Sequence, residues 1–279
     1  MSHTTSRPHA DRARQTLAKV PEITLLFWVL KLLTTGMGEA MSDFLGQHSV
    51  PIAGAIGILG MIVALRLQLR QTEYRAPYYW FAVMMVAVFG TMAADGIHDG
   101  AGIGYAATTP LFALVTAAIF WWWYRSEGTL SIHSINTRRR ERFYWAAVLA
   151  TFALGTAAGD LTALALNLGF WPSVLIFGAI MAVPALGWWR LNWNPIFSFW
   201  FAYVVTRPLG ASFADGFSKP TNGGLSLGDG TVSAIALIIF IGLVAYAHRT
   251  KSDVQAQGDI HPHHEHHAAP VPGLAYDSE

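Results

Sequence analysis

The chain has 279 residues, of which 53% are hydrophobic and only 13% are charged, with a formal net charge of +1. Soluble domains usually carry about a quarter charged residues, so this composition excludes a typical water-soluble enzyme and indicates a protein that folds in lipid. Because there is no cysteine, disulfides, thiolate metal ligands and cysteine nucleophiles are also excluded.

Eight apolar stretches dominate the sequence. Each is long enough to cross the hydrocarbon core, which needs about 20 helical residues. They cover about residues 22–45, 50–69, 77–97, 105–124, 142–165, 170–189, 196–215 and 230–248. The sequence therefore predicts an all-α integral membrane domain over 22–248, with a polar tail before it at 1–21 and a disordered His-rich tail after it at 249–279.

Basic residues predict the orientation. If the amino terminus is cytoplasmic, fifteen Lys and Arg residues lie on the cytoplasmic side and only Lys219 lies outside, with Lys31 and Arg207 inside spans. Cytoplasmic loops of membrane proteins carry an excess of Lys and Arg. We therefore expect a multi-pass protein of the bacterial inner membrane with both termini in the cytoplasm.

The strongest pattern is an internal repeat. The spacing Trp-x9-Gly-x4-Asp occurs four times, on the first, third, fifth and seventh predicted helices. The four copies run Trp28–Asp43, Trp80–Asp95, Trp145–Asp160 and Trp200–Asp215. Repeats of this kind define a fold. Since all four helices enter from one side, the two-helix repeats (22–69, 77–124, 142–189, 196–248) are predicted to be parallel, with pseudo-symmetry about the membrane normal.

The first repeat has a motif of its own. It comprises Lys19-Val20-Pro21-Glu22, Phe27-Trp28, Lys31, Gly38-Glu39 and Asp43. With this motif the chain resembles a bacterial family of uncharacterised membrane-anchored proteins, built from four tandem two-helix repeats of unknown function that each carry a signature Trp. The later copies depart from it, with Thr91, Thr156 and Ala211 in place of Glu39, and Val83, Val148 and Tyr203 in place of Lys31. The resemblance implies the membrane architecture and no particular activity.

The repeated carboxylates are the main candidate site. Asp43, Asp95, Asp160 and Asp215 fall at one depth near the outer ends of their helices, where the helix dipole also disfavours anions. If they face one axis, they need protons or a cation, and hard oxygen ligands suit divalent ions. The alternative is that they are solvated interfacial caps. Further candidate ligands are Glu39, one turn before Asp43, and His98 and Asp99, which follow Asp95. The imidazole of His98 would shift the preference toward Mn or Zn.

Two ionisable residues lie deeper in the predicted spans. Lys31 and Arg207 are the only basic residues there, and Glu39 is a candidate partner for either one. They are interpreted either as part of a structural ion pair or as part of an ion pathway. The repeated Trp28, Trp80, Trp145 and Trp200 fit a lipid-facing aromatic belt, which is the preferred interpretation, or a gating or packing collar around the axis.

A histidine cluster lies in the carboxy-terminal tail. Its members are His261, His263, His264, His266 and His267. Histidine tracts bind transition metals, so the tail is predicted to contact a metal ion, with a neutral tail as the alternative.

These features favour one function. We expect a transporter or exporter of a divalent metal cation, with protons as a coupling ion and the lipid bilayer as surroundings. The alternatives are a non-transporting scaffold or metal-sensing subunit and, more weakly, an intramembrane enzyme. The sequence has no phosphate-binding glycine loop, nucleophile elbow, His-Glu-x-x-His pair or nucleic-acid motif. We therefore predict neither an enzyme nor a nucleic-acid partner.

Overall fold

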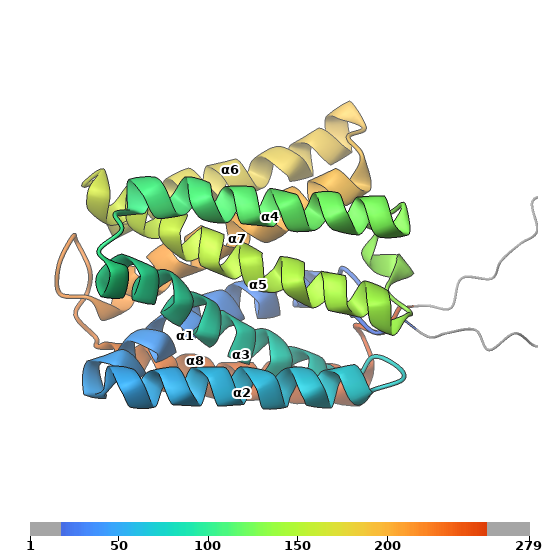
Figure 1. The fold of residues 1–279 in the computed structure, drawn as a ribbon, viewed down its shortest axis with the longest axis horizontal. Coiled ribbons are helices and arrows are strands. Elements are labelled where there is room, and N and C mark those ends of the chain that lie inside the picture. The colour runs from blue at the N-terminus through green and yellow to red at the C-terminus, as the bar shows by residue number, and fades with distance from the viewer. Residues whose placement is uncertain (1–17, 256–279) are drawn as a thin grey trace, which may run out of the picture.

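A computed structural model of the chain describes residues 18–255, and these form a bundle of long helices (Figure 1). The helices are α1 (Leu25–His48), α2 (Val50–Arg70), α3 (Ala76–Asp95), α4 (Tyr105–Glu127), α5 (Arg138–Asp160), α6 (Phe170–Leu191), α7 (Pro195–Ser218) and α8 (Asp229–Thr250). Three short helical turns join them, namely η1 (Gly96–Gly100), η2 (Ile132–Ser134) and η3 (Leu161–Ala165). The all-helical, eight-helix architecture predicted from the sequence is confirmed.

The odd-numbered helices form an inner ring and the even-numbered helices form an outer layer. Helix α1 contacts α3 and α7, and α5 contacts the same two helices, so the inner ring is closed. Each outer helix packs mainly on the inner helix of the next repeat: α2 on α3, α4 on α5, α6 on α7 and, closing the circle, α8 on α1. The repeats therefore interlock, and the last repeat returns to cover the first.

The repeated glycine is where neighbouring inner helices touch. A Cβ atom added to Gly38, Gly90, Gly155 or Gly210 would lie less than 3.0 Å from one residue of the next inner helix in the ring. That residue has the same position in its repeat in all four cases. Those residues are Ala87, Phe152, Arg207 and Thr35, in that order, and each lies three residues before the glycine of its own repeat. The same crossing is thus made four times around the ring. Small residues allow such close approach of helices in membranes.

The composition of the helices fits a membrane-spanning bundle. Among the described residues, six helices are long and apolar enough to span a membrane, namely α2, α3 with η1, α4, α5 with η3, α6 and α8. The outer helices expose large apolar side chains such as Ile52, Leu59, Leu114 and Ile238. Helices α1 and α7 are also of spanning length but carry the ionisable residues, and they lie in the inner ring. The chain is therefore a multi-pass helical membrane protein.

The predicted spans match the helices to within a few residues, and the main difference lies in the third repeat. Helix α5 begins at Arg138, earlier than the predicted span at 142, because Thr137 accepts a hydrogen bond from the Arg140 amide and caps a polar first turn. Helices α3 and α5 end at the repeated Asp95 and Asp160 and continue as the π-turns η1 and η3. Helices α1 and α7 remain α-helical past Asp43 and Asp215, so the pseudo-fourfold ring has two kinds of inner helix.

The bundle has two chemically different ends. The carboxyl-terminal ends of α1, α3, α5 and α7 lie on the left of Figure 1, and this end is called here the acidic end because each of these helices carries its repeated Asp there in sequence. Both ends of the described chain lie at the other, basic end. There the segment before α1 is fixed by buried contacts: Lys19 Nζ lies 2.7 Å from Glu141 Oε2, and Gln68 donates to the same carboxylate. The side-chain hydroxyl of Tyr74 donates to Asp253 after α8. The motif at Lys19 thus closes the basic end of the bundle.

The glycine crossings generate a prediction about stability. Replacing Gly38 by Val places atoms against Ala87 and the α3 backbone, so the two helices must separate. Overpacking of this kind costs about 1–3 kcal/mol. We expect a clear fall in the apparent Tm of the detergent-purified protein for Gly38→Val. The control, Gly54→Val on α2, has open space around the added atoms and should leave the Tm unchanged. Equal Tm values for the two variants would contradict the crossing.

Candidate functional site

One stripe of residues on each inner helix is buried along the ring axis. The stripe recurs every four residues, and residues four apart share one face of a helix. From the basic end, the first four layers are Phe27, Tyr79, Tyr144, Phe199; then Lys31, Val83, Val148, Tyr203; then Thr35, Ala87, Phe152, Arg207; then Glu39, Thr91, Thr156, Ala211, all of them buried. The repeated Asp residues form the fifth layer at the acidic end. The backbone repeats from helix to helix, whereas the side chains in each layer differ.

Arg207, from the third layer, binds three side chains of the fourth layer. Its side chain is 1% exposed, and its Nη2 lies 2.6 Å from Glu39 Oε2. The same nitrogen donates to Thr91 Oγ1 and, at 2.7 Å, to Thr156 Oγ1, while Nη1 donates to the Thr35 carbonyl at 2.9 Å. One guanidinium therefore binds the equivalent side chains of the other three repeats. The predicted ion pair exists, and Glu39 is the partner of Arg207.

Lys31 has a different environment. It is 1% exposed, and its ammonium lies 3.8 Å from the centroid of the Phe152 ring and 4.1 Å from that of the Tyr203 ring. Within residues 18–255 the ammonium makes no hydrogen bond and no ion pair. The alternative that Lys31 pairs with Glu39 is therefore wrong. Aromatic faces attract a cation, but each contributes only about 0.5–2 kcal/mol, less than a buried carboxylate partner would.

Three carboxylates meet at the acidic end. Single oxygen atoms of Glu39, Asp43 and Asp215 lie within 4.8 Å of one another, a spacing that can hold a metal ion. Asp215 is 5% exposed, and its Oδ1 has no hydrogen-bond partner among the described residues. A buried oxygen left unpaired is costly, so this atom calls for a proton or a cation. Helices α1 and α7 supply all three groups because they are neighbours in the ring.

Lys219 is a basic residue at this end that was not among the predicted site residues. It follows α7, and its Nζ lies 2.5 Å from Asp43 Oδ2 and 3.0 Å from Asp229 Oδ2. Burial alone would lower the pKa of Lys219, but the carboxylates, Asp43 first, outweigh burial and raise that pKa above its ordinary value. Lys219 is thus a permanent cation beside the three carboxylates. The signal for it was its position as the single basic residue on the predicted outer side.

The other predicted metal ligands do not join this group. Among the described residues, Asp95, Asp160 and His98 belong to no set of three or more ligand atoms at metal-binding distance. His98 Nδ1 instead donates a hydrogen bond to the Ile103 carbonyl, and the ring stacks on Tyr105. The side chain of Asp99 is outside what the structure describes, as is the histidine cluster (His261, His263, His264, His266, His267).

The repeated tryptophans lie in the packed interior. Trp80, Trp145 and Trp200 are buried, and Trp28 is half-buried. Packing of the inner ring therefore describes them better than a lipid-facing belt, which was the preferred interpretation. The exposed Trp residues lie instead on the outer helices α4 and α6, and they are Trp121, Trp122, Trp188 and Trp189.

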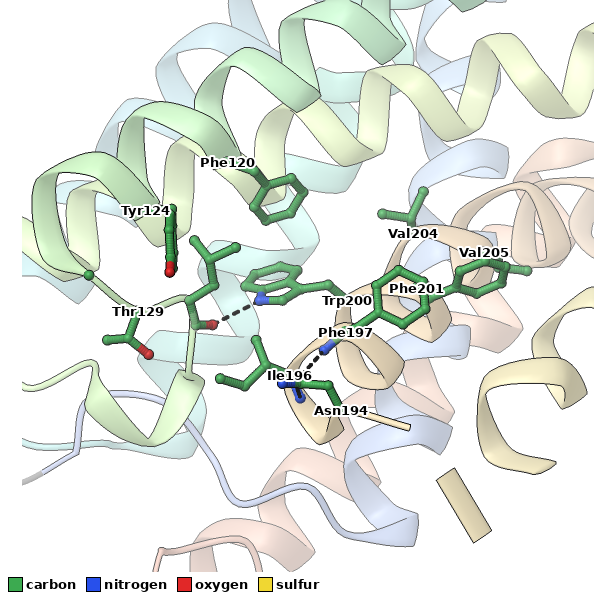
Figure 2. A pocket seen from close by; sticks show the side chains of 12 residues that line it. Phe120, Tyr124, Thr129, Asn194, Ile196, Phe197, Trp200, Phe201, Val204 and Val205 are labelled. Atoms are coloured by element: carbon green, nitrogen blue, oxygen red, sulfur yellow. Dashed lines mark hydrogen bonds between the residues drawn. The ribbon is translucent and has the colours of Figure 1, made fainter. Parts of the chain in front are cut away.

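Two apolar cavities open on the flank of the bundle, away from the carboxylates. One, of about 620 Å³, lies between α4 and α7, with Trp200 at its floor donating a hydrogen bond to the Leu130 carbonyl (Figure 2). The other, of about 640 Å³, lies over the seam of α1 and α7 beside α8. Neither is lined by an acidic or basic side chain. Neither of these two cavities therefore offers a charged group to a ligand.

The repeats match a known family. A family model described as "Repeat of Unknown Function (DUF347)" matches residues 78–129, 143–193 and 198–253, together more than half of the chain. The chain belongs to this family. Each matched DUF347 repeat is one inner helix with the outer helix that follows it. No curated protein and no solved structure matches the chain.

The structure adds a fourth copy to the three matched DUF347 repeats. Helices α1 and α2 lie outside the matched segments, yet α1 has the same Trp, Gly and Asp spacing and makes the same glycine crossing. This divergent copy supplies Lys31 and Glu39, and the last copy supplies Arg207. The charged groups of the first four axial layers thus belong to the first and last repeats, which meet where the ring closes.

The buried pair generates a second prediction. Removing one partner of a buried ion pair leaves an uncompensated charge and costs about 3–5 kcal/mol. We expect Arg207→Met and Glu39→Gln each to lower the apparent Tm strongly. The double variant should lose clearly less than the sum of the two, because neither charge is then left alone. Arg249→Met, at the exposed end of α8, is the control. Additive losses would show that the pair does not act as a unit.

Proposed function

We propose that this protein transports a divalent metal cation, with Mn or Zn as the preferred ion, and binds it at the acidic end between Glu39, Asp43 and Asp215. The observation that carries the proposal is the meeting of these three carboxylates around the unpaired Oδ1 of Asp215. Carboxylate oxygens are the ligands that Mn shares with Mg and Ca.

The charges at the acidic end support this reading. Among the described side chains there, six carboxylates outnumber the two basic groups, Arg207 and Lys219. The carboxylates are Glu39, Asp43, Asp95, Asp160, Asp215 and Asp229. Such a surplus in a partly desolvated site must be balanced by protons or by a bound cation. By the excess of basic residues at the opposite end, the acidic end is proposed to face the outside.

The filled axis favours a carrier over an open pore. All four axial layers on the basic side of the repeated Asp residues are buried, and aromatic side chains occupy the layer nearest the basic end. An ion at the acidic end therefore cannot pass along the axis in this conformation. We propose that this is one state of a carrier in which the inner helices rearrange to move the ion.

Arg207 would compete with the metal ion for Glu39. Glu39 is both a member of the proposed metal site and the partner of Arg207. A metal ion bound to Glu39 would compete with the guanidinium for the same carboxylate. Metal binding is therefore proposed to weaken the contacts of Arg207 that hold the first, second and third repeats together.

Mn²⁺ binding by the purified protein tests the proposal. Removing a ligand should weaken binding about 10-fold or more, since even partners of ligands contribute 10–100-fold. We expect this loss for Asp43→Asn and for Asp215→Asn, measured by titration calorimetry. Asp95→Asn occupies the same repeat position outside the three-carboxylate group and is the matched control, with affinity close to that of the parent.

Two results would contradict the proposal. If Asp95→Asn weakens binding as much as Asp215→Asn, the site is not at the α1–α7 seam. If the parent binds neither Mn²⁺ nor Zn²⁺ and shows no flux in proteoliposomes, transport of these ions is wrong. A scaffold or sensor subunit would then account better for the repeats.

A further inference from the structure

Lys31 is a buried cationic side chain that the proposed metal site does not use. Lys31 is 1% exposed. Its ammonium contacts two aromatic rings and has no acidic partner among the described residues. Burial disfavours the charged form of such a group, while the rings favour it only in part. Among the described residues, the two rings are the contacts that stabilise its charge.

The charged and titratable groups in the axial layers around Lys31 come from all four inner helices. They are Arg207 and Tyr203 on α7, Tyr79 on α3, Tyr144 on α5, and Glu39 on α1 itself. Glu39 is the one acid of this set, and Arg207 already binds it. The charge state of Lys31 therefore depends on how well Arg207 is neutralised.

The Phe152 ring contacts both Lys31 and Arg207. Its ring centroid lies 3.8 Å from Lys31 Nζ and 5.3 Å from Arg207 Cζ, so both basic groups contact one ring. When Glu39 neutralises Arg207, the repulsion across this ring is small. When a metal ion takes Glu39, the guanidinium charge is no longer balanced, and its repulsion of the Lys31 ammonium grows.

We propose that Lys31 binds and releases the proton that is exchanged for the metal ion, and that Arg207 couples the two events. The inference rests on the proposed function. In the step, one N–H bond of the ammonium breaks, the electron pair stays on Nζ, and the proton passes to water that enters the axis when the inner helices rearrange. The reverse occurs when the metal leaves and Glu39 binds Arg207 again. Metal and proton exclude one another, so the carrier is an antiporter.

A pair of hydroxyls lies on the side from which the proton would come. Tyr79 and Tyr144 hydrogen-bond to each other through their side-chain oxygens in the layer between Lys31 and the basic end. Each hydroxyl can both accept and donate a proton. This pair is the route proposed between Lys31 and the basic end.

The test measures Mn²⁺ and proton movement together in proteoliposomes that contain a pH-sensitive dye. The parent should move protons opposite to Mn²⁺. Lys31→Met and Lys31→Arg, which cannot exchange the proton, should keep Mn²⁺ binding at the acidic end in detergent. Both should lose the proton movement and the pH dependence of Mn²⁺ uptake. Lys251→Met, beyond α8, is the control and should behave as the parent.

Each other outcome overturns a separate claim. Mn²⁺ movement by the parent without an opposite proton movement overturns this inference and leaves the proposed function intact. Proton-coupled uptake in Lys31→Met does the same. Absence of saturable Mn²⁺ and Zn²⁺ binding in the parent overturns the proposed function, and this inference with it.

Discussion

The close crossing of neighbouring inner helices at the repeated glycine is the constraint on which the structure depends. Four such crossings, each against the residue three positions before the next glycine, close the inner ring. A side chain at any of these glycines would push the helices apart. Because the crossings are equivalent, they also place equivalent residues of the four helices in common layers. The axial stripe and its chemistry follow from this one contact.

A ring made of equivalent backbones does not need equivalent side chains. Three copies place a hydroxyl or a carboxyl in the fourth layer, and Arg207 from the layer before it binds all of them. A hub on the axis can reach every helix, which explains why one guanidinium can satisfy three repeats. The acidic layer is likewise unequal: Asp43 and Asp215 meet Glu39 at the α1–α7 seam, whereas Asp95 and Asp160 end their α-helices and lead into π-turns. π-turns inside helices are frequent at functional sites.

The sequence predicted the fold well because its signals are local. Spans of about 20 apolar residues, basic loops and the spacing from Trp28 to Asp43 are all visible along the chain. The site was predicted only in part. The depth of the Asp residues followed from the repeat, but the choice of Asp215 and Asp43 over Asp95 depends on which helices are neighbours when the ring closes. The burial of Trp80 and Trp145 was missed because an aromatic residue near a span end is typical of a belt, although a packed interface uses the same residue type.

The assignment of Glu39 shows the same limit. It lies eight residues after Lys31 on one helix, and both candidate cations were compatible with its position. The structure selects Arg207, 168 residues away in sequence, because the last repeat packs beside the first. Contacts between the ends of a closed ring leave no trace in local spacing. They decide which charges are paired, and so which group remains to exchange a proton.

The most direct test of the account is the position of a bound ion. Anomalous diffraction from crystals grown with Mn²⁺ locates the metal without reference to any variant. The account predicts a peak between the carboxylates of Glu39, Asp43 and Asp215, with the Arg207 guanidinium displaced from Glu39. A peak beside Asp95 and Asp160, or a structure with no peak on the axis and Arg207 still bound to Glu39, would contradict it.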